Sequence, residues 1–215
     1  AGYRCSHYAP RYQVGEPYAP PVLERFLNPH LDREFVLAAM KTGYWDLRRA
    51  SEALQADREV VLAAVKQQGW DLNLASEALR ADREVVLAAV KHHGFALRYA
   101  STALRNDREV VLVAVKQHGN ALEYASEALR NDREVVSVAM EQHMGSVKYT
   151  SNLELRDLVL VALKQGALDL RSASAVFRAD REVMLAAVKQ HGNALEYASE
   201  ALRADREVVL AAVKH

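Results

Sequence analysis

The chain has 215 residues, in which 28 lysine and arginine side chains are balanced by 28 aspartate and glutamate side chains. Nucleic acids and anionic lipid surfaces attract proteins that carry excess positive charge, so this balance argues against both as the main partner. The longest wholly apolar runs, such as 110–115, span six residues. They are far shorter than the ~20 residues that a membrane-spanning helix needs.

Residues 1–29 are predicted to form an extended N-terminal arm. All five prolines lie in this segment, and proline fixes its own φ and biases the residue before it towards extended backbone. The arm also carries Tyr3, Tyr8, Tyr12 and Tyr18. Because tyrosine combines an apolar ring with a polar tip, we expect these side chains either to lie over the first repeat or to contact a partner.

Residues 30–215 consist of a 25-residue unit that repeats along the chain. Residues 116–136 read KQHGNALEYASEALRNDREVV, and residues 189–209 differ from them at one position. An Asp-Arg-Glu triplet begins at Asp32, Asp57, Asp82, Asp107, Asp132, Asp180 and Asp205. A fixed period of this length is typical of a solenoid, so the sequence predicts an all-α solenoid of about eight helix-turn-helix repeats.

The first helix of each unit is exemplified by residues 107–119. Asn106 or Asp107 is expected to cap its N-terminus, and Gly119 is expected to end it in the left-handed conformation. Residues 110–115 are apolar on every side of this helix. We therefore expect the first helices to be covered on several sides and to form an inner layer between neighbouring repeats.

The second helix is predicted to begin at Asn120 and to continue through Leu129. Its apolar residues fall on one face, and its glutamates and Arg130 fall elsewhere, where they meet water. Helices of about ten residues are marginal in isolation, so each repeat should be stabilised by its neighbours.

The repeat is irregular around residues 144–157. The loop glycine, Gly145, comes one residue late, and the unit is two residues short between Ser151 and Arg156. We expect this irregularity to change the angle between stacked repeats. The last repeat is incomplete and ends in the apolar run 208–213, so we expect further chain or a partner to cover it.

The consensus DREVVLAAVKQHGNALEYASEALR resembles the short helical repeat of domain-of-unknown-function family 4116. The resemblance covers residues 31–215 and is interrupted only at 144–157. It implies an all-α tandem array and, because the family occurs mainly in algae, other protists and some intracellular bacteria, a protist-like source. It implies no activity and no catalytic residues.

Several residue types recur at one position of the repeat without indicating chemistry. His93, His118, His143 and His191 should be separated by steps of about 10 Å, too far apart to share one metal ion. A serine recurs in every complete unit, and we expect its hydroxyl to bond a backbone carbonyl. Phosphate-binding loops, CxxC pairs and nucleophile elbows are absent from the sequence. We therefore expect no catalytic residue, no cofactor and no metal.

Aromatic residues provide the best candidate for a recognition surface. Trp45, Trp70 and Phe95 follow the first helix in three successive units, where Asn120 and Asn193 stand in later ones. Aromatic side chains are enriched at binding hot spots, but the N-terminal arm could equally pack on these rings. A second candidate surface consists of Leu153, Leu155 and Phe177 in or near the irregular segment.

These features predict a non-enzymatic scaffold whose partners are other protein subunits of a larger assembly. The family distribution and a first residue other than Met favour an accessory or linker subunit of an organellar complex, such as one on the photosynthetic membrane of a plastid. Two alternatives remain. A recurring arginine, as at Arg80 and Arg105, could read RNA one repeat at a time, and a secreted effector could dock a host protein.

Overall fold

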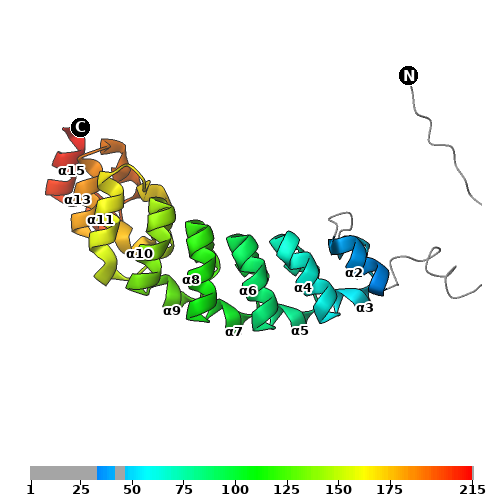
Figure 1. The fold of residues 1–215 in the computed structure, drawn as a ribbon. Helices are drawn as coiled ribbons and strands as arrows, with labels where there is room; N and C mark the ends of the chain where they lie inside the picture. Colours follow the sequence, from blue (N-terminus) through cyan, green and yellow to red (C-terminus); the bar gives the residue numbers. More distant parts are fainter. Residues whose placement is uncertain (1–32, 42–46, 215) are drawn as a thin grey trace, which may run out of the picture.

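The structure, a computed structural model, describes residues 33–41 and 47–214. The predicted arm, with Tyr3, Tyr8, Tyr12 and Tyr18, lies outside the described residues, and so does Trp45. Within the described ranges every regular element is helical, and the repeats stand side by side in a curved row (Figure 1). The prediction of an all-α solenoid is confirmed.

Two kinds of element alternate along the row. Each repeat contributes one longer helix: α2 (Arg33–Lys41), α4 (Arg58–Gln67), α6 (Arg83–His92), α8 (Arg108–Gln117), α10 (Arg133–Gln142), α11 (Arg156–Lys164), α13 (Arg181–Val188) and α15 (Arg206–Val213). Short helices of one turn stand between them: α3 (Glu52–Gln55), α5 (Glu77–Arg80), α7 (Thr102–Arg105), α9 (Glu127–Arg130), α12 (Ala175–Arg178) and α14 (Glu200–Arg203). The 3-10 segments are η1 (Leu47–Arg49), η2 (Gly69–Leu74), η3 (Gly94–Tyr99), η4 (Gly119–Tyr124), η5 (Met144–Tyr149), η6 (Leu153–Leu155), η7 (Leu170–Ser172) and η8 (Gly192–Tyr197).

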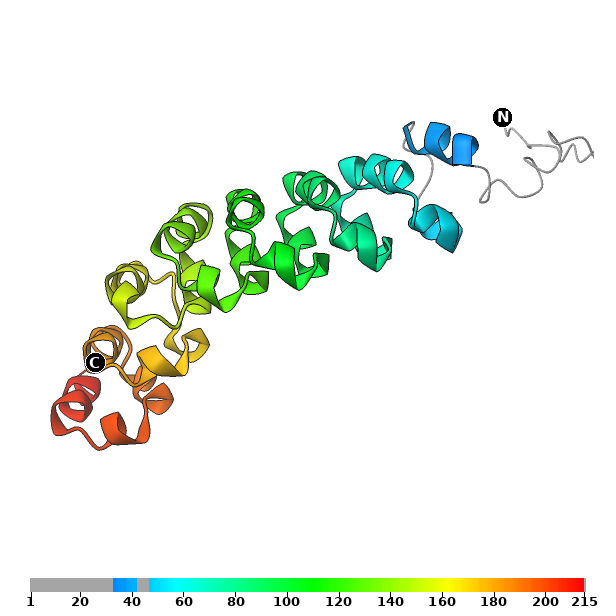
Figure 2. The ribbon, with the colours of Figure 1, turned by 90° about the horizontal axis from the view of Figure 1, so that it is seen from below.

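The two kinds of element form two layers. The long helices lie on the outside of the curve, and the short helices lie on the inside (Figure 2). Along most of the row, each long helix packs beside the long helices of the neighbouring repeats. It also packs against the adjacent 3-10 segments. Within residues 33–41 and 47–214, no further layer of elements lies outside the long helices (Figure 2).

The aspartate of the Asp-Arg-Glu triplet caps the long helix, as predicted. In α8, the side chain of Asp107 accepts hydrogen bonds from the backbone N–H groups of Glu109 and Val110, at 3.0 and 3.1 Å. Asn106, the alternative cap, instead closes the preceding short helix α7. Asp107 therefore satisfies two of the amide groups that the first turn leaves without an intrahelical partner.

The predicted second helix is broken into two pieces, η4 and α9. Between them, Ala125 and Ser126 have extended backbone. The backbone N–H of Ser126 donates to the carbonyl oxygen of Arg105 in the preceding repeat at 2.9 Å, and its Oγ accepts from the N–H of Leu129 at 3.4 Å. The serine is therefore an N-cap, and the prediction that its hydroxyl bonds a backbone carbonyl is wrong.

Gly119 does not end α8 in the left-handed conformation. Among the described residues, only Gly166 has a positive φ, of 68°. A Cβ atom on Gly119 would lie 2.3 Å from the carbonyl oxygen of Ala139 in the next repeat. Glycine is needed here because the backbones of neighbouring repeats approach each other closely, not because of its conformational freedom.

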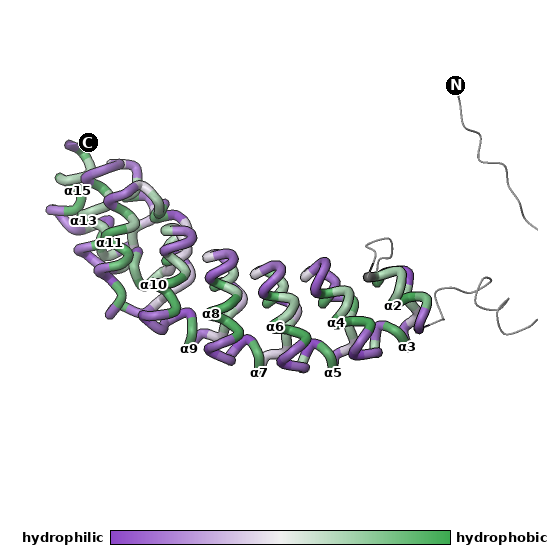
Figure 3. Tube along the Cα trace, viewed as in Figure 1, coloured by the Kyte–Doolittle hydropathy of each residue, from purple (hydrophilic) through white to green (hydrophobic). Residues whose placement is uncertain are grey.

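The hydrophobic core runs between the layers and between neighbouring long helices. Four residues of α8 are buried, namely Val110, Val111, Ala114 and Val115. Leu112 and Val113 are only half-buried. Apolar residues occupy the middles of the long helices, and polar residues lie at their ends (Figure 3). The expectation that these helices are covered on several sides is therefore confirmed in part, since one face stays half-buried. The expectation that they form an inner layer is wrong, because the long helices lie on the outside of the curve.

The irregular segment changes the direction of the row after α10 (Figures 1 and 2). Met144 stands where Gly119 stands one repeat earlier, and Gly145 makes the close approach instead, since a Cβ atom there would lie 2.8 Å from the carbonyl oxygen of Ala167. Whereas α10 packs along α8, α11 packs against η5. The expected change of angle therefore accompanies the one-residue shift of the loop glycine and the shortened unit.

Candidate functional site

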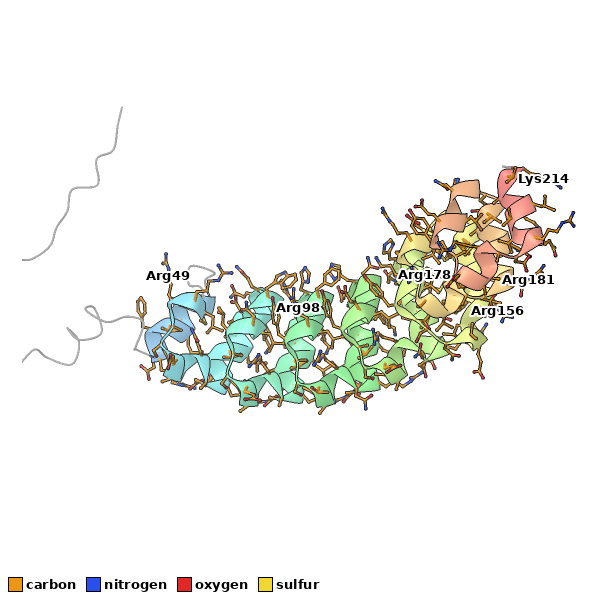
Figure 4. The ribbon with its side chains drawn as sticks, turned by 180° about the vertical axis from the view of Figure 1, so that it is seen from behind. Arg49, Arg98, Arg156, Arg178, Arg181 and Lys214 are labelled. Atoms are coloured by element: carbon orange, nitrogen blue, oxygen red, sulfur yellow. The ribbon has the colours of Figure 1, made fainter. Side chains whose placement is uncertain are left out.

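The charged residues of the triplets form a ladder at the N-terminal ends of the long helices. In most steps, the arginine of one repeat reaches the aspartate and the glutamate of the next, as Arg83 does with Asp107, at 3.0 Å, and with Glu109, whereas Arg133 reaches only Asp157. The same pattern joins Arg33 to Asp57 and Glu59, Arg58 to Asp82 and Glu84, Arg108 to Asp132 and Glu134, Arg156 to Asp180 and Glu182, and Arg181 to Asp205 and Glu207. Arg156 and Arg181 lie on the same side of the C-terminal repeats (Figure 4). These charged side chains form ion pairs with one another, and the pairs align each repeat with the next.

Aromatic side chains form a second continuous feature, at the edge where the long helices pass into the 3-10 segments. We call it the aromatic ribbon, and it consists of Trp70, His93, Phe95, Tyr99, His118 and Tyr124. The rings of Trp70 and His93 lie with centroids 4.4 Å apart, and those of Phe95 and His118 lie 5.0 Å apart. Each of these contacts joins two successive repeats.

The histidines within the ribbon lie closer together than the sequence predicted. The rings of His93 and His118 are stacked with centroids 4.5 Å apart, so the expected step of about 10 Å is wrong for this pair. The Nδ1 atom of His118 accepts a hydrogen bond of 3.2 Å from the backbone N–H of Gly94 in the preceding repeat. This bond draws the ring of His118 across the junction towards His93.

The electrostatic surroundings of the ribbon favour a neutral His93. Burial, together with the charges that His118 and His92 would carry, holds the pKa of His93 below its ordinary value. The positive charge at the ribbon comes instead from Arg98, whose guanidinium lies 5.3 Å from the ring centroid of Tyr99 and 5.5 Å from that of Tyr124. Arg98 lies in the middle repeats of the row (Figure 4).

Tyr149 stands 25 residues after Tyr124 of the ribbon, as Tyr124 stands 25 residues after Tyr99. The Nζ atom of Lys148 lies 4.9 Å from the ring centroid of Tyr149. Burial raises the pKa of this phenol to about 12, assisted by the charge of Glu123 and by a hydrogen bond with it. The phenol is therefore neutral at physiological pH.

Trp70 is the most accessible part of the ribbon. Its side chain is 40% exposed, whereas Phe95, Tyr99 and Tyr124 are half-buried. The structure thus brings together two of the three predicted stripe residues, Trp70 and Phe95, with ring centroids 6.4 Å apart. An exposed indole flanked by ordered rings resembles the anchor residues of protein interfaces.

Of the second candidate surface, which consists of Leu153, Leu155 and Phe177, only Leu153 is exposed in the structure. Leu153 is 45% exposed, but Leu155 and Phe177 are 2% and 1% exposed and belong to the core. Phe177 takes the place that Leu104 has in α7, and this place faces the long helix of its own repeat. We therefore remove Leu155 and Phe177 from the candidate contact residues, and Leu153 remains.

Sequence reasoning missed most of the ribbon. His93 and His118 were treated as separate helix-end residues, and Tyr99, Tyr124 and Arg98 were not considered as site residues. The signal that could have found them is the period itself, because residues 25 positions apart stand in one column along a solenoid. Tyr99, Tyr124 and Tyr149 follow this spacing.

A family model described as "Domain of unknown function (DUF4116)" matches residues 32–80, 82–130, 113–155, 156–203 and 180–215. No curated protein and no solved structure matches the chain. The helices of the described segments are all too short or too polar to cross a bilayer.

Proposed function

We infer that this chain, which belongs to the DUF4116 family, is a protein-interaction scaffold without enzymatic activity. The aromatic ribbon is the observation that carries this inference. Its most exposed member, Trp70, packs against three rings of the next repeat, so its side chain would lose little conformational freedom on binding. A tandem helical array also offers a long surface in which each repeat contributes one part.

We propose further that the scaffold serves as a peripheral accessory or linker subunit of a larger assembly. The exposed Leu153, away from the ribbon, offers a second point of attachment, as a linker between subunits needs. The family's occurrence in algae favours a plastid complex associated with the photosynthetic membrane, and the chain would reach that membrane through its partner subunits.

The test compares variants that the protein's own repeats show to be compatible with the fold. Asn120 and Asn193 occupy the positions equivalent to Trp70 and Phe95, so Trp70→Asn with Phe95→Asn should preserve the helical array. The wild-type full chain and this double variant are each used to capture bound proteins from native extract. The captured proteins are quantified by mass spectrometry. Loss of an interface hot spot weakens binding by about tenfold or more, so we expect a specific partner to be depleted in the variant.

Leu153→Ser is the matched control, because it removes an exposed apolar side chain from the other candidate surface. Depletion by Leu153→Ser alone would move the interface to the irregular segment. Isolation of the wild-type chain as a free monomer, with no specific protein bound, would contradict the scaffold function.

A further inference from the structure

The outer face of the long helices is more apolar than a solvent-facing surface requires. Leu62 in α4, Leu87 in α6 and Leu112 in α8 pack against the core but are only half-buried. An amphipathic helix ordinarily turns polar residues towards water. These leucines are 25 residues apart and take the same place on three successive long helices, and we call them the leucine stripe. The long-helix layer to which they belong lies on the outside of the curve (Figure 2).

A groove lies within this stripe between α4 and α6. Its floor is formed by Leu62, Leu87 and Ala88, and its volume is about 470 Å³. It follows the direction of the two helices, which run side by side. Apolar grooves of this kind between helices hold a third helix by apolar residues spaced three or four positions apart.

The charges around the groove are positive at one end. Lys66, Lys91 and His92 line that end, and Glu84 lines the other. Glu84 is occupied by Arg58, whereas Lys66 and Lys91 form no ion pair within the described parts of the chain. The charge available to a ligand is therefore that of the two lysines.

The groove also adjoins the aromatic ribbon. The Nδ1 atom of His92 accepts a hydrogen bond of 3.3 Å from the backbone N–H of Gly69, the residue before Trp70. One partner could thus lie along the groove and extend over Trp70.

The stripe ends at α10, where the repeat departs from its own pattern. Ser137 and Glu141 stand in α10 at the positions of Leu87 and Lys91 in α6. Both the apolar contact and the cation are therefore lost together at this repeat. The helix itself is retained, so neither leucine nor lysine is required at these positions for folding.

We propose that the groove between α4 and α6 binds an acidic amphipathic helix of a partner protein. Leucine-like side chains of that helix occupy the floor formed by Leu62 and Leu87, and its carboxylates face Lys66 and Lys91. The proposal deepens the scaffold function and rests on it, because it names the chemical class of the partner.

The test uses a display library of helices about four turns long. All members carry a leucine stripe, and the flanking positions vary between glutamate and lysine. The full chain is expected to enrich the glutamate-flanked helices. The affinity of the best of them, measured by fluorescence anisotropy, is expected to fall with added salt because the cations at the groove are exposed.

The decisive variant is Leu87→Ser with Lys91→Glu, which gives α6 the residues that α10 already has. We expect it to weaken binding by about tenfold or more. The same exchange in α13, Leu185→Ser with Lys189→Glu, is the control and should leave binding unchanged. Absence of enrichment, enrichment of lysine-flanked helices, undiminished binding by the α6 variant, or loss of binding in the α13 control would each overturn the proposal.

These outcomes separate the two proposals. If Trp70→Asn with Phe95→Asn depletes a native partner but the library yields no acidic helix, the groove proposal fails and the scaffold function stands. If the groove binds acidic helices but the native chain has no partner, the scaffold function fails.

Discussion

His93 and His118 belong to successive repeats, and their imidazole rings stack with centroids 4.5 Å apart. The stack is held by the bond from the Gly94 N–H to Nδ1 of His118, which requires that this nitrogen carry no proton. A positive charge on His93 is disfavoured at this junction by burial and by the neighbouring His118 and His92, which together lower its pKa. The proximity of two imidazoles within a partly buried junction makes it sensitive to acid.

We predict that the chain loses stability as the pH falls below about 6.5, the ordinary pKa of histidine. Burial, His118 and His92 lower the pKa of His93 in the folded chain. The unfolded chain therefore binds more protons between that lowered pKa and 6.5, and protonation favours unfolding in this window. Above it, both states are neutral at this residue and no effect is expected.

The measurement is the melting temperature across this pH range. His93→Gln is the matched control, since Gln68 occupies the same position one repeat earlier. The variant should lose less stability on acidification than the wild type. An identical pH profile for both proteins would refute the role of His93.

Gly94→Ala is predicted to destabilise the chain by about 1–3 kcal/mol. The added Cβ would lie 2.3 Å from the carbonyl oxygen of Ala114, a backbone atom that cannot move without shifting the next repeat. Gly166→Ala is the comparison, because a Cβ there meets no atom but the backbone has a φ of 68°. It should cost about 1–2 kcal/mol. Urea unfolding of the full chain provides the measurement, and a wild-type midpoint for Gly94→Ala would contradict the close approach.

Substitutions of Asp82 should separate its two roles. Its carboxylate caps α6 through the N–H groups of Glu84 and Val85, at 3.0 and 3.1 Å, and also bonds Nε of Arg58 at 2.8 Å. The hydrogen bond from Arg58 is the main reason why the pKa of Asp82 lies below its ordinary value. The stability that it contributes is thus present above about pH 4 and is lost as the pH falls through the lowered pKa.

Asp82→Asn keeps a capping oxygen and loses the ion pair, whereas Asp82→Ala loses both. We expect the alanine variant to be less stable than the asparagine variant by about 1 kcal/mol. Thermal unfolding at neutral pH measures this difference. Equal stabilities would show that the cap contributes nothing at this position.

Much of the fold could be predicted from the sequence because the 25-residue period of the repeat is visible in the amino-acid sequence itself. The aspartate caps, the long apolar helices and the irregular repeat at Met144 all follow from local patterns read at 25-residue intervals. The broken second helix was less accessible, although Ser126 followed by Glu127 is a recognisable N-cap signal. The predicted helix ran through it because the apolar spacing alone does not reveal the extended residues.

The 25-residue pattern shows which side chains recur in each column of the solenoid and which helices need a neighbour. How neighbouring columns pack against one another follows from the three-dimensional contacts between repeats. Whether His93 meets His118, whether Phe177 is buried, and whether Leu87 faces open space depend on the angle and distance between repeats. These are set by contacts between residues about one repeat apart, such as Gly119 with Ala139, and not by the pattern within a single helix.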